Sequence, residues 1–290
     1  MVPLAVGTQT NGSVIRPGAY CGVMGYKPTL GHISRHGVLA QSRHLDTVGV
    51  YGRGVEDVAL IGDVLSVYDA RDPDMGPRSR PRLAETAAAE PPLEPIFAFV
   101  KSPVWDQAEA DAKEAFAEIA AFLGEGCDEV ALPEPFDKAV ELHRTIMLAD
   151  LAKSFAGYYE RGADRLSARL RDMIQEGQSV LAMDYNRAVD WIEILNAGLD
   201  QVFERYDAIL TPATTGEAPA GLESTGSPVF CTLWTYCGTP AITLPLLVGA
   251  NGLPLGVQLV GRRGDDARLL RTASWLARRV ASEDRDRGTV

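Results

Sequence analysis

The chain has 290 residues, of which 46% are hydrophobic and 23% are charged, and its formal net charge is −11. This is an ordinary globular composition, and the length suits one large domain or two closely packed lobes. An acidic chain gains nothing from counterion release on a polyanion, which argues against direct nucleic-acid binding.

The cysteine spacing and the apolar segments indicate in which cellular compartment the protein is expected. None of the cysteines forms a C-x-x-C pair, which indicates reduced thiols in a cytoplasmic protein. The first ten residues carry no basic region, which argues against a secretion signal. Prolines, glycines and the turn signal Asn251-Gly252 interrupt the most apolar stretch, Ala241–Gly261. That pattern predicts a hairpin and not a membrane span.

The first third of the chain predicts a strand, a long loop and a helix. Val2–Val6 is a short apolar run that suits a buried strand. Gly7–Gly18 is loop-like, and Pro17 is expected to prevent a regular helix there. Val55–Tyr68 has helical apolar spacing, whereas residues 70–95 are rich in proline and charge and predict a surface connection.

Strand and helix signals alternate through the remainder. The predicted strands are 96–100, 130–132, 208–210 and a hairpin of 241–248 with 253–260. The predicted helices are 106–123 with Gly124 as its stop, a region 137–205 broken near Gly162 and Gly177, and a last helix from Asp265 or Asp266 to Val280. This alternation predicts an α/β layered domain.

The turn Thr10-Asn11-Gly12-Ser13 is the first candidate for chemistry. A serine hydroxyl is a weak nucleophile until a base takes its proton and donors stabilise the oxyanion. Gly12 permits unusual backbone angles, and consecutive N–H groups in such a turn can converge on an anion. The alternative is a structural turn in which Ser13 bonds its own backbone, and spacing alone favours that alternative.

Other site types fit this region less well. The spacing from Gly7 to Gly12 resembles a phosphate loop but lacks its lysine, and the serine lacks the second glycine of a nucleophile elbow. A Ser-His-Asp triad could use Asp46 with one of three histidines, all of which lie in turn-like sequence. They are His32, His36 and His44. His32 and His36 do not lie on a helical face that would suit zinc, and His143 is interpreted as a packing residue.

Residues 7–29, "GTQTNGSVIRPGAYCGVMGYKPT", closely resemble the second half of the amidase signature. The following blocks up to residue 70, and "YDAILTPAT", "GTPAITLPL" and "GLPLGVQLVGRRGDDARLL" in residues 205–275, match the same family in order. The resemblance implies a mixed β-sheet covered by helices, in which residues 1–290 form a single domain. Residues 70–95 and 137–205 are then a variable surface connection and a variable helical region.

The resemblance also implies a site. Amidase-signature enzymes use a Ser–cis-Ser–Lys triad, and their nucleophile falls on Ser13. Their oxyanion hole falls on the backbone N–H groups of Thr10, Asn11 and Gly12. No metal or organic cofactor is implied.

The chain departs from the family pattern at the base. In such enzymes the bridging serine and the lysine lie upstream of the segment that matches residues 2–8, and no residue here is their equivalent. Lys27 in "GYKPT" is not the triad lysine and is a poor substitute base. We therefore expect the C-terminal portion of an amidase with its N-terminal part missing, impaired in activity and exposing a sheet edge and apolar surface.

Three further positions are candidates near the site. Gln9 stands where many relatives have an aspartate, which removes a charge beside the turn. Arg16 could bind a substrate carboxylate or pair with a backbone carbonyl or an acid, and both interpretations stay open. Trp234 and Tyr236 are candidates for an acyl pocket, although aromatic residues more often fill a core.

The function expected from these observations is hydrolysis of a small-molecule carboxamide through an acyl-Ser13 intermediate. One alternative is the A subunit of a glutamine-dependent aminoacyl-tRNA amidotransferase, which would bring partner subunits. The other is a catalytically inactive remnant or binding module. The expected setting is cytoplasmic, without direct nucleic-acid or membrane binding, and a homodimer is compatible with it.

Overall fold

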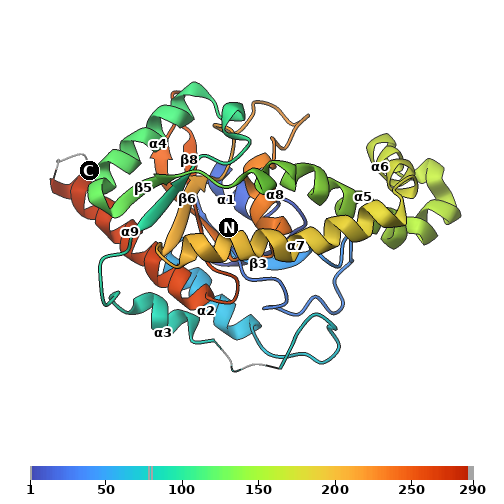
Figure 1. The fold of residues 1–290 in the computed structure, drawn as a ribbon, viewed down its shortest axis with the longest axis horizontal. Helices are drawn as coiled ribbons and strands as arrows, with labels where there is room; N and C mark the ends of the chain where they lie inside the picture. Colours follow the sequence, from blue (N-terminus) through green and yellow to red (C-terminus); the bar gives the residue numbers. More distant parts are fainter. Residues whose placement is uncertain (1, 78, 80, 287–290) are drawn as a thin grey trace.

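A single mixed sheet organises the computed structural model, which describes residues 2–77, 79 and 81–286 (Figure 1). Its strands are β1 (Ala5–Gln9), β2 (Met24–Lys27), β3 (Thr47–Gly52), β4 (Phe97–Val100), β5 (Cys127–Val130), β6 (Ala208–Pro212), β7 (Ala241–Val248) and β8 (Pro254–Val260). They follow the order β1-β3-β2-β7-β8-β6-β4-β5. β4 pairs in parallel with β5 and β6, and the other neighbours are antiparallel. The expected α/β fold with a mixed sheet is confirmed.

Helices cover both faces of this sheet. They are α1 (Ile15–Tyr20), α2 (Val55–Leu65), α3 (Leu83–Ala88), α4 (Ala110–Leu123), α5 (Ala139–Gly162), α6 (Ala168–Gln178), α7 (Ala182–Phe203), α8 (Val229–Tyr236) and α9 (Asp266–Asp286). In Figure 1, α2, α3 and α9 lie side by side, whereas α6 and the adjoining ends of α5 and α7 reach beyond the sheet at one end of the molecule.

The strands divide the core into two parts because their side chains alternate between faces. On β4, Ala98 and Val100 pack toward α5, α7 and α8, whereas Phe97 and Phe99 pack toward α2, α3, α4 and α9. The same alternation continues on the neighbouring strands. Burial on both faces explains why these strands are almost continuously apolar in sequence.

Most predicted elements are present. The region 137–205 forms α5, α6 and α7, the C-terminal hairpin forms β7 and β8, and Gly124 ends α4 with a φ of 55°. Strand β1 begins at Ala5 and not at Val2, and β5 ends at Val130 where the prediction began.

Two predictions are wrong. Pro17 lies inside α1, because a proline in the first turn of a helix removes no intrahelical hydrogen bond. Residues 70–95 are not only a surface connection, because they include α3. Leu83 and Ala87 of α3 are fully buried between α2 and α9.

The site lies where β1 leaves the sheet. β1 pairs with β3 on one side and forms the outer edge on the other. The chain then turns through residues 10–14 into α1, which packs directly on the sheet. A Cβ added at Gly256 of β8 would come within 2.5 Å of Ala19 Cβ, so glycine allows this close approach.

The burial of α3 gives a direct test of its place in the core. Leu83→Ala is expected to lower the free energy of unfolding by about 2–5 kcal/mol, because it removes a buried side chain and leaves a cavity. The matched change Leu93→Ala, at a side chain that is 83% exposed, is expected to cost about 0.5 kcal/mol or less. Urea denaturation of both variants measures the difference, and equal costs would contradict the packing described for α3.

Candidate active site

The buried Gln9 amide closes the turn that carries Ser13. Gln9 is 1% exposed, and its Oε1 accepts from the backbone N–H groups of Val14 and Ile15 at 2.8 and 2.9 Å. Its Nε2 donates to Thr235 Oγ1 on α8 at 2.8 Å. Val14, at the start of α1, has no side-chain cap of its own, so Gln9 satisfies the first N–H groups of that helix.

Gly12 is required for space. A Cβ at this position would come within 2.9 Å of Pro228 Cβ and 3.3 Å of Cys231 Cβ. The turn is thus pressed against the beginning of α8. Gly12 does not have a positive φ, so the expectation that it provides an unusual backbone angle is wrong.

Ser13 lies exposed at the end of the turn. Its backbone carbonyl accepts a hydrogen bond from the Tyr51 hydroxyl at 2.9 Å. Within the part of the chain that the structure describes, the Ser13 hydroxyl has no hydrogen-bond partner. The structural alternative, a serine bonded to its own backbone, is therefore not observed.

The other residues of the turn are held from the buried side. The Thr10 hydroxyl donates to Asp46 Oδ1 at 2.6 Å, and the Thr10 carbonyl contacts His143 Nε2 on α5 at 3.0 Å. The Asn11 side-chain oxygen accepts from the Thr232 hydroxyl at 2.7 Å, and the Asn11 carbonyl accepts from the Thr235 hydroxyl at 2.5 Å.

His143 is more than the packing residue expected from sequence. Burial lowers its pKa to about 4, so the imidazole is neutral at pH 7. A carbonyl can only accept, and therefore Nε2 carries the proton that the imidazole donates to Thr10. The contact spans 133 positions of the sequence, so no local pattern could have revealed it.

Arg16 pairs with a backbone carbonyl, which is the structural interpretation of the two given above. Its Nη1 donates to the Gly226 carbonyl at 2.9 Å, and its Nη2 donates to Thr225 Oγ1 at 3.2 Å. These bonds hold the loop before α8 against α1. The guanidinium therefore already has partners in this structure.

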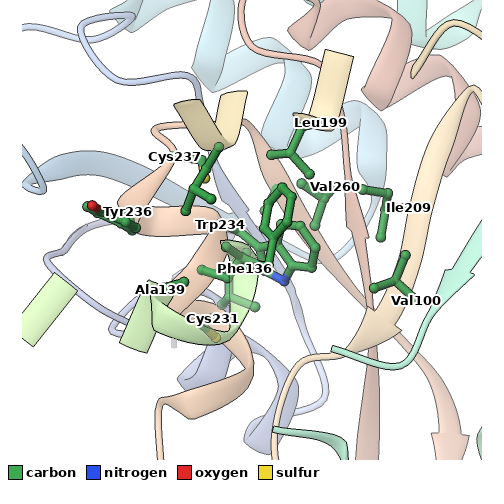
Figure 2. Packing of buried hydrophobic residues seen from close by; sticks show 14 of the residues in the cluster. Val100, Phe136, Ala139, Leu199, Ile209, Cys231, Trp234, Tyr236, Cys237 and Val260 are labelled. Atoms are coloured by element: carbon green, nitrogen blue, oxygen red, sulfur yellow. The ribbon is translucent and has the colours of Figure 1, made fainter. Parts of the chain in front are cut away.

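Trp234 and Tyr236 are buried core residues, and their role in an acyl pocket stays a prediction. They are 1% and 0% exposed and pack with Phe136 and Leu199 in the cluster of Figure 2. The reason is that α8 is buried on every side, so its aromatic residues fill the core. The α8 side chains that donate hydrogen bonds to the turn are those of Thr232 and Thr235, which are three positions apart and share a helix face.

The candidate bases from sequence have other partners. Asp46 accepts from Thr10 and from the N–H groups of Gln41 and Ser42 at 2.7 and 2.9 Å. His32 lies 3.4 Å from Asp266, and His44 lies 3.6 Å from Asp150. Within the described residues, none of the three histidines, His36 included, is hydrogen-bonded to Ser13, so the Ser-His-Asp alternative is not assembled there.

Lys27 is also engaged elsewhere. Its Nζ is fully buried and donates to the carbonyls of Pro28 and Thr239 at 3.1 and 2.5 Å. Burial lowers its pKa to about 8, although the charge of Asp266 opposes that shift. These bonds explain why a lysine is tolerated in the interior.

A cavity of about 360 Å³ adjoins the turn. Thr8 and Thr10 line one side of it, and the loop 35–47 lines another. Arg35 on its wall is paired with Asp72, with Nε and Oδ2 3.3 Å apart, and also with Asp74. Val38 and Leu39 add apolar surface to its walls, so the cavity that Thr10 shares with the turn is mixed in character.

Two other kinds of site are absent from residues 2–77, 79 and 81–286. No helix in these ranges is long and apolar enough to cross a membrane. No cluster of three or more histidine, cysteine, aspartate or glutamate side chains in them could hold a metal ion.

The sequence pattern of the Amidase family matches residues 1–270. The chain belongs to the amidase family. It is 31% identical to the A subunit of glutamyl-tRNA(Gln) amidotransferase from Symbiobacterium thermophilum, in an alignment that covers 96% of this chain and 63% of that protein. It is 30% identical to the protein of the same name from Rhodopirellula baltica, with 94% and 63% covered. This amidase-family chain therefore spans just under two thirds of the length of these relatives.

Solved structures of amidase-family proteins have the same fold. The A subunit of glutamyl-tRNA(Gln) amidotransferase from Thermotoga maritima matches with a TM-score of 0.74 and 27% identity, covering 93% of this chain and 61% of that one. A 6-aminohexanoate cyclic dimer hydrolase matches with a TM-score of 0.80 and 23% identity, covering 96% and 64%. The second likeness concerns the fold alone.

The low pKa of His143 makes stability depend on pH. Between pH 6.5 and about 4 the unfolded chain binds a proton at His143 that the folded chain excludes, so stability falls as the pH falls through this range. His143→Gln keeps an N–H donor but does not titrate. From pH 7 to 4.5 the wild type is expected to lose about 2 kcal/mol more free energy of unfolding than this variant. Urea denaturation at both pH values checks this, and parallel losses would contradict it.

Proposed function

We propose that this chain carries the nucleophile of an amidase, and that Ser13 attacks a small carboxamide to form an acyl-enzyme. The observation that supports this most strongly is an exposed, unpartnered hydroxyl on a turn whose backbone is fixed from its buried side. A rigid turn of this kind can present preorganised N–H donors to a developing oxyanion. Family membership supports the same reaction class.

In the proposed reaction, Ser13 Oγ adds to the amide carbon, and the carbonyl electrons move to the oxygen. Collapse of this intermediate breaks the C–N bond and forms the ester, and the departing nitrogen takes up the proton that Ser13 gave to a base. Water then hydrolyses the ester, which releases the carboxylic acid and restores the Ser13 hydroxyl.

The reaction needs a base for the Ser13 proton. In the residues that the structure describes, no side chain is bonded to this hydroxyl. The family resemblance assigns the role to a lysine acting through a bridging serine, and neither has a match in these 290 residues. We therefore expect the reaction of this polypeptide to be slow, because the remaining donors give only a fraction of the full acceleration.

The cavity beside Thr10 is the proposed place for the amide substrate. Its walls combine threonine side chains and paired charges with the apolar side chains of Val38 and Leu39, which suits a small amide that has both polar and apolar parts. The preference for a small carboxamide and the absence of a cofactor remain predictions. So do the cytoplasmic setting and a homodimer.

A second candidate is the A subunit of a glutamine-dependent amidotransferase. It is supported by the two relatives at 31% and 30% identity, both of which are named as that subunit of glutamyl-tRNA(Gln) amidotransferase. In that case the amide would be glutamine, and the partners would be other protein subunits. Ammonia release from glutamine, compared with release from propionamide and benzamide, distinguishes the two candidates.

Covalent labelling tests whether Ser13 is a nucleophile. A fluorophosphonate probe is expected to label the folded chain at Ser13, as located by peptide mass spectrometry. Ser13→Ala is expected to abolish the labelling and to lower any amidase rate by at least about 10³-fold. The same variant should melt at nearly the wild-type temperature, since the hydroxyl has no bond to lose.

The control for this labelling is chain unfolded in urea. Labelling of folded wild type no faster than this control would contradict the proposal and favour a non-catalytic binding module.

A further inference from the structure

The carbonyl groups of Thr10, Asn11 and Gly12 in the Ser13 turn all accept hydrogen bonds, two of them from the interior helices α5 and α8. The Thr10 carbonyl accepts from His143 on α5, and the Asn11 carbonyl accepts from the Thr235 hydroxyl on α8. The Gly12 carbonyl accepts from the Arg16 N–H at 2.9 Å. Three consecutive peptide units therefore have their oxygen atoms bonded.

A trans peptide unit directs its N–H opposite to its C=O. The bonds to the three carbonyls thus turn the N–H groups of Asn11, Gly12 and Ser13 away from those bonded partners. In the described part of the chain, none of these three N–H groups has a hydrogen-bond acceptor. This set lies one position later than the N–H groups of Thr10, Asn11 and Gly12 that the resemblance implies.

We propose that His143 and Thr235 are positioning residues for the amidase reaction. By holding the carbonyls of Thr10 and Asn11 from behind, they aim the N–H groups of Asn11 and Gly12 at the oxyanion that forms when Ser13 attacks. The inference rests on the proposed function of Ser13, and neither residue touches the reacting atoms.

Each bond has a defined direction. The Thr235 hydroxyl accepts from Gln9 Nε2 and therefore gives its only proton to the Asn11 carbonyl. A hydroxyl that accepts a bond is also a stronger donor. The neutral His143 imidazole donates to the Thr10 carbonyl, as described above. Neither donor can reverse its role without leaving a buried group unpaired.

The aromatic core supports His143. The His143 ring lies edge-on to Tyr236, with centroids 6.5 Å apart and planes at 88°. The Tyr236 hydroxyl in turn donates to the Ala188 carbonyl on α7 at 2.5 Å. Tyr236 therefore packs against the imidazole that binds the turn.

Paired substitutions separate positioning from packing. His143→Leu and Thr235→Val remove the donor and keep most of the volume, whereas His143→Gln and Thr235→Ser keep a donor. Thr232→Val is the matched control, because this hydroxyl lies on the same helix face and binds Asn11 through its side chain and not its carbonyl. His143→Asn tests whether polarity alone is enough at this position, because the asparagine amide is polar but too short to reach the Thr10 carbonyl.

The first measurement is the fluorophosphonate reaction of Ser13, as a function of probe concentration. The variants without a donor, His143→Asn included, are expected to lower the maximal labelling rate by about 10–100-fold, with less than about threefold change in the half-saturating concentration. His143→Gln and Thr235→Ser should recover most of this rate, and Thr232→Val should lose less than Thr235→Val. Equal rates within each pair, or a loss confined to the half-saturating concentration, would overturn the proposal.

The second measurement does not depend on reactivity. The amide ¹H–¹⁵N resonance of Asn11 is expected to shift in His143→Leu, and that of Gly12 in Thr235→Val, with both restored in the conservative variants. An unreactive wild type would count against the proposed function, and these resonances would still decide the positioning role. If the Asn11 and Gly12 resonances stay unchanged in His143→Leu and Thr235→Val, the positioning role of His143 and Thr235 is overturned.

Discussion

The hydrogen bonds of the Gln9 side chain hold together the parts of the structure that meet beneath the turn. Gln9 ends β1, its oxygen binds the first N–H groups of α1, and its nitrogen binds Thr235 on α8. A buried amide that is hydrogen-bonded through both its oxygen and its nitrogen is stabilising, whereas the loss of one partner would leave an uncompensated polar group. Gln9 therefore links β1, α1 and α8 at the base of the turn.

An amide at this position does what a carboxylate could not. An acidic residue could also accept from Val14 and Ile15, but it could not donate to Thr235. The Thr235 proton would then be drawn to the carboxylate, and the Asn11 carbonyl would lose its donor. Glutamine therefore does more than remove a charge beside the turn. It sets the direction of two hydrogen bonds, from Gln9 to Thr235 and from Thr235 to the Asn11 carbonyl.

Elements with strong periodicity could be predicted from the sequence, and contacts between distant segments could not. The helices of residues 137–205 and the C-terminal hairpin follow from apolar spacing and glycine positions, because local forces decide them. The turn sequence around Ser13 and its resemblance to the amidase signature are enough to select Ser13 as the candidate residue. The side chains that donate to the Thr10 and Asn11 carbonyls lie 133 and 224 positions away, and a sequence pattern carries no signal of which histidine or threonine will reach them. The burial of Tyr236 could not be predicted for the same reason, since the packing of α8 on all sides is a tertiary property.

The two sides of the turn differ in a way that bears on the chemistry. On the buried side, every carbonyl from Thr10 to Gly12 is bonded, and Gly12 is packed too closely for any side chain. On the outer side, β1 is a sheet edge, Val6 is 57% exposed, and the Ser13 hydroxyl faces solvent. Oxyanion stabilisation needs rigidity, which the interior supplies, whereas proton transfer needs a base on the open side. Under the proposed function, the fixed backbone of residues 10–13 would stabilise the oxyanion. Among the described residues, no side chain is bonded to the Ser13 hydroxyl as its base.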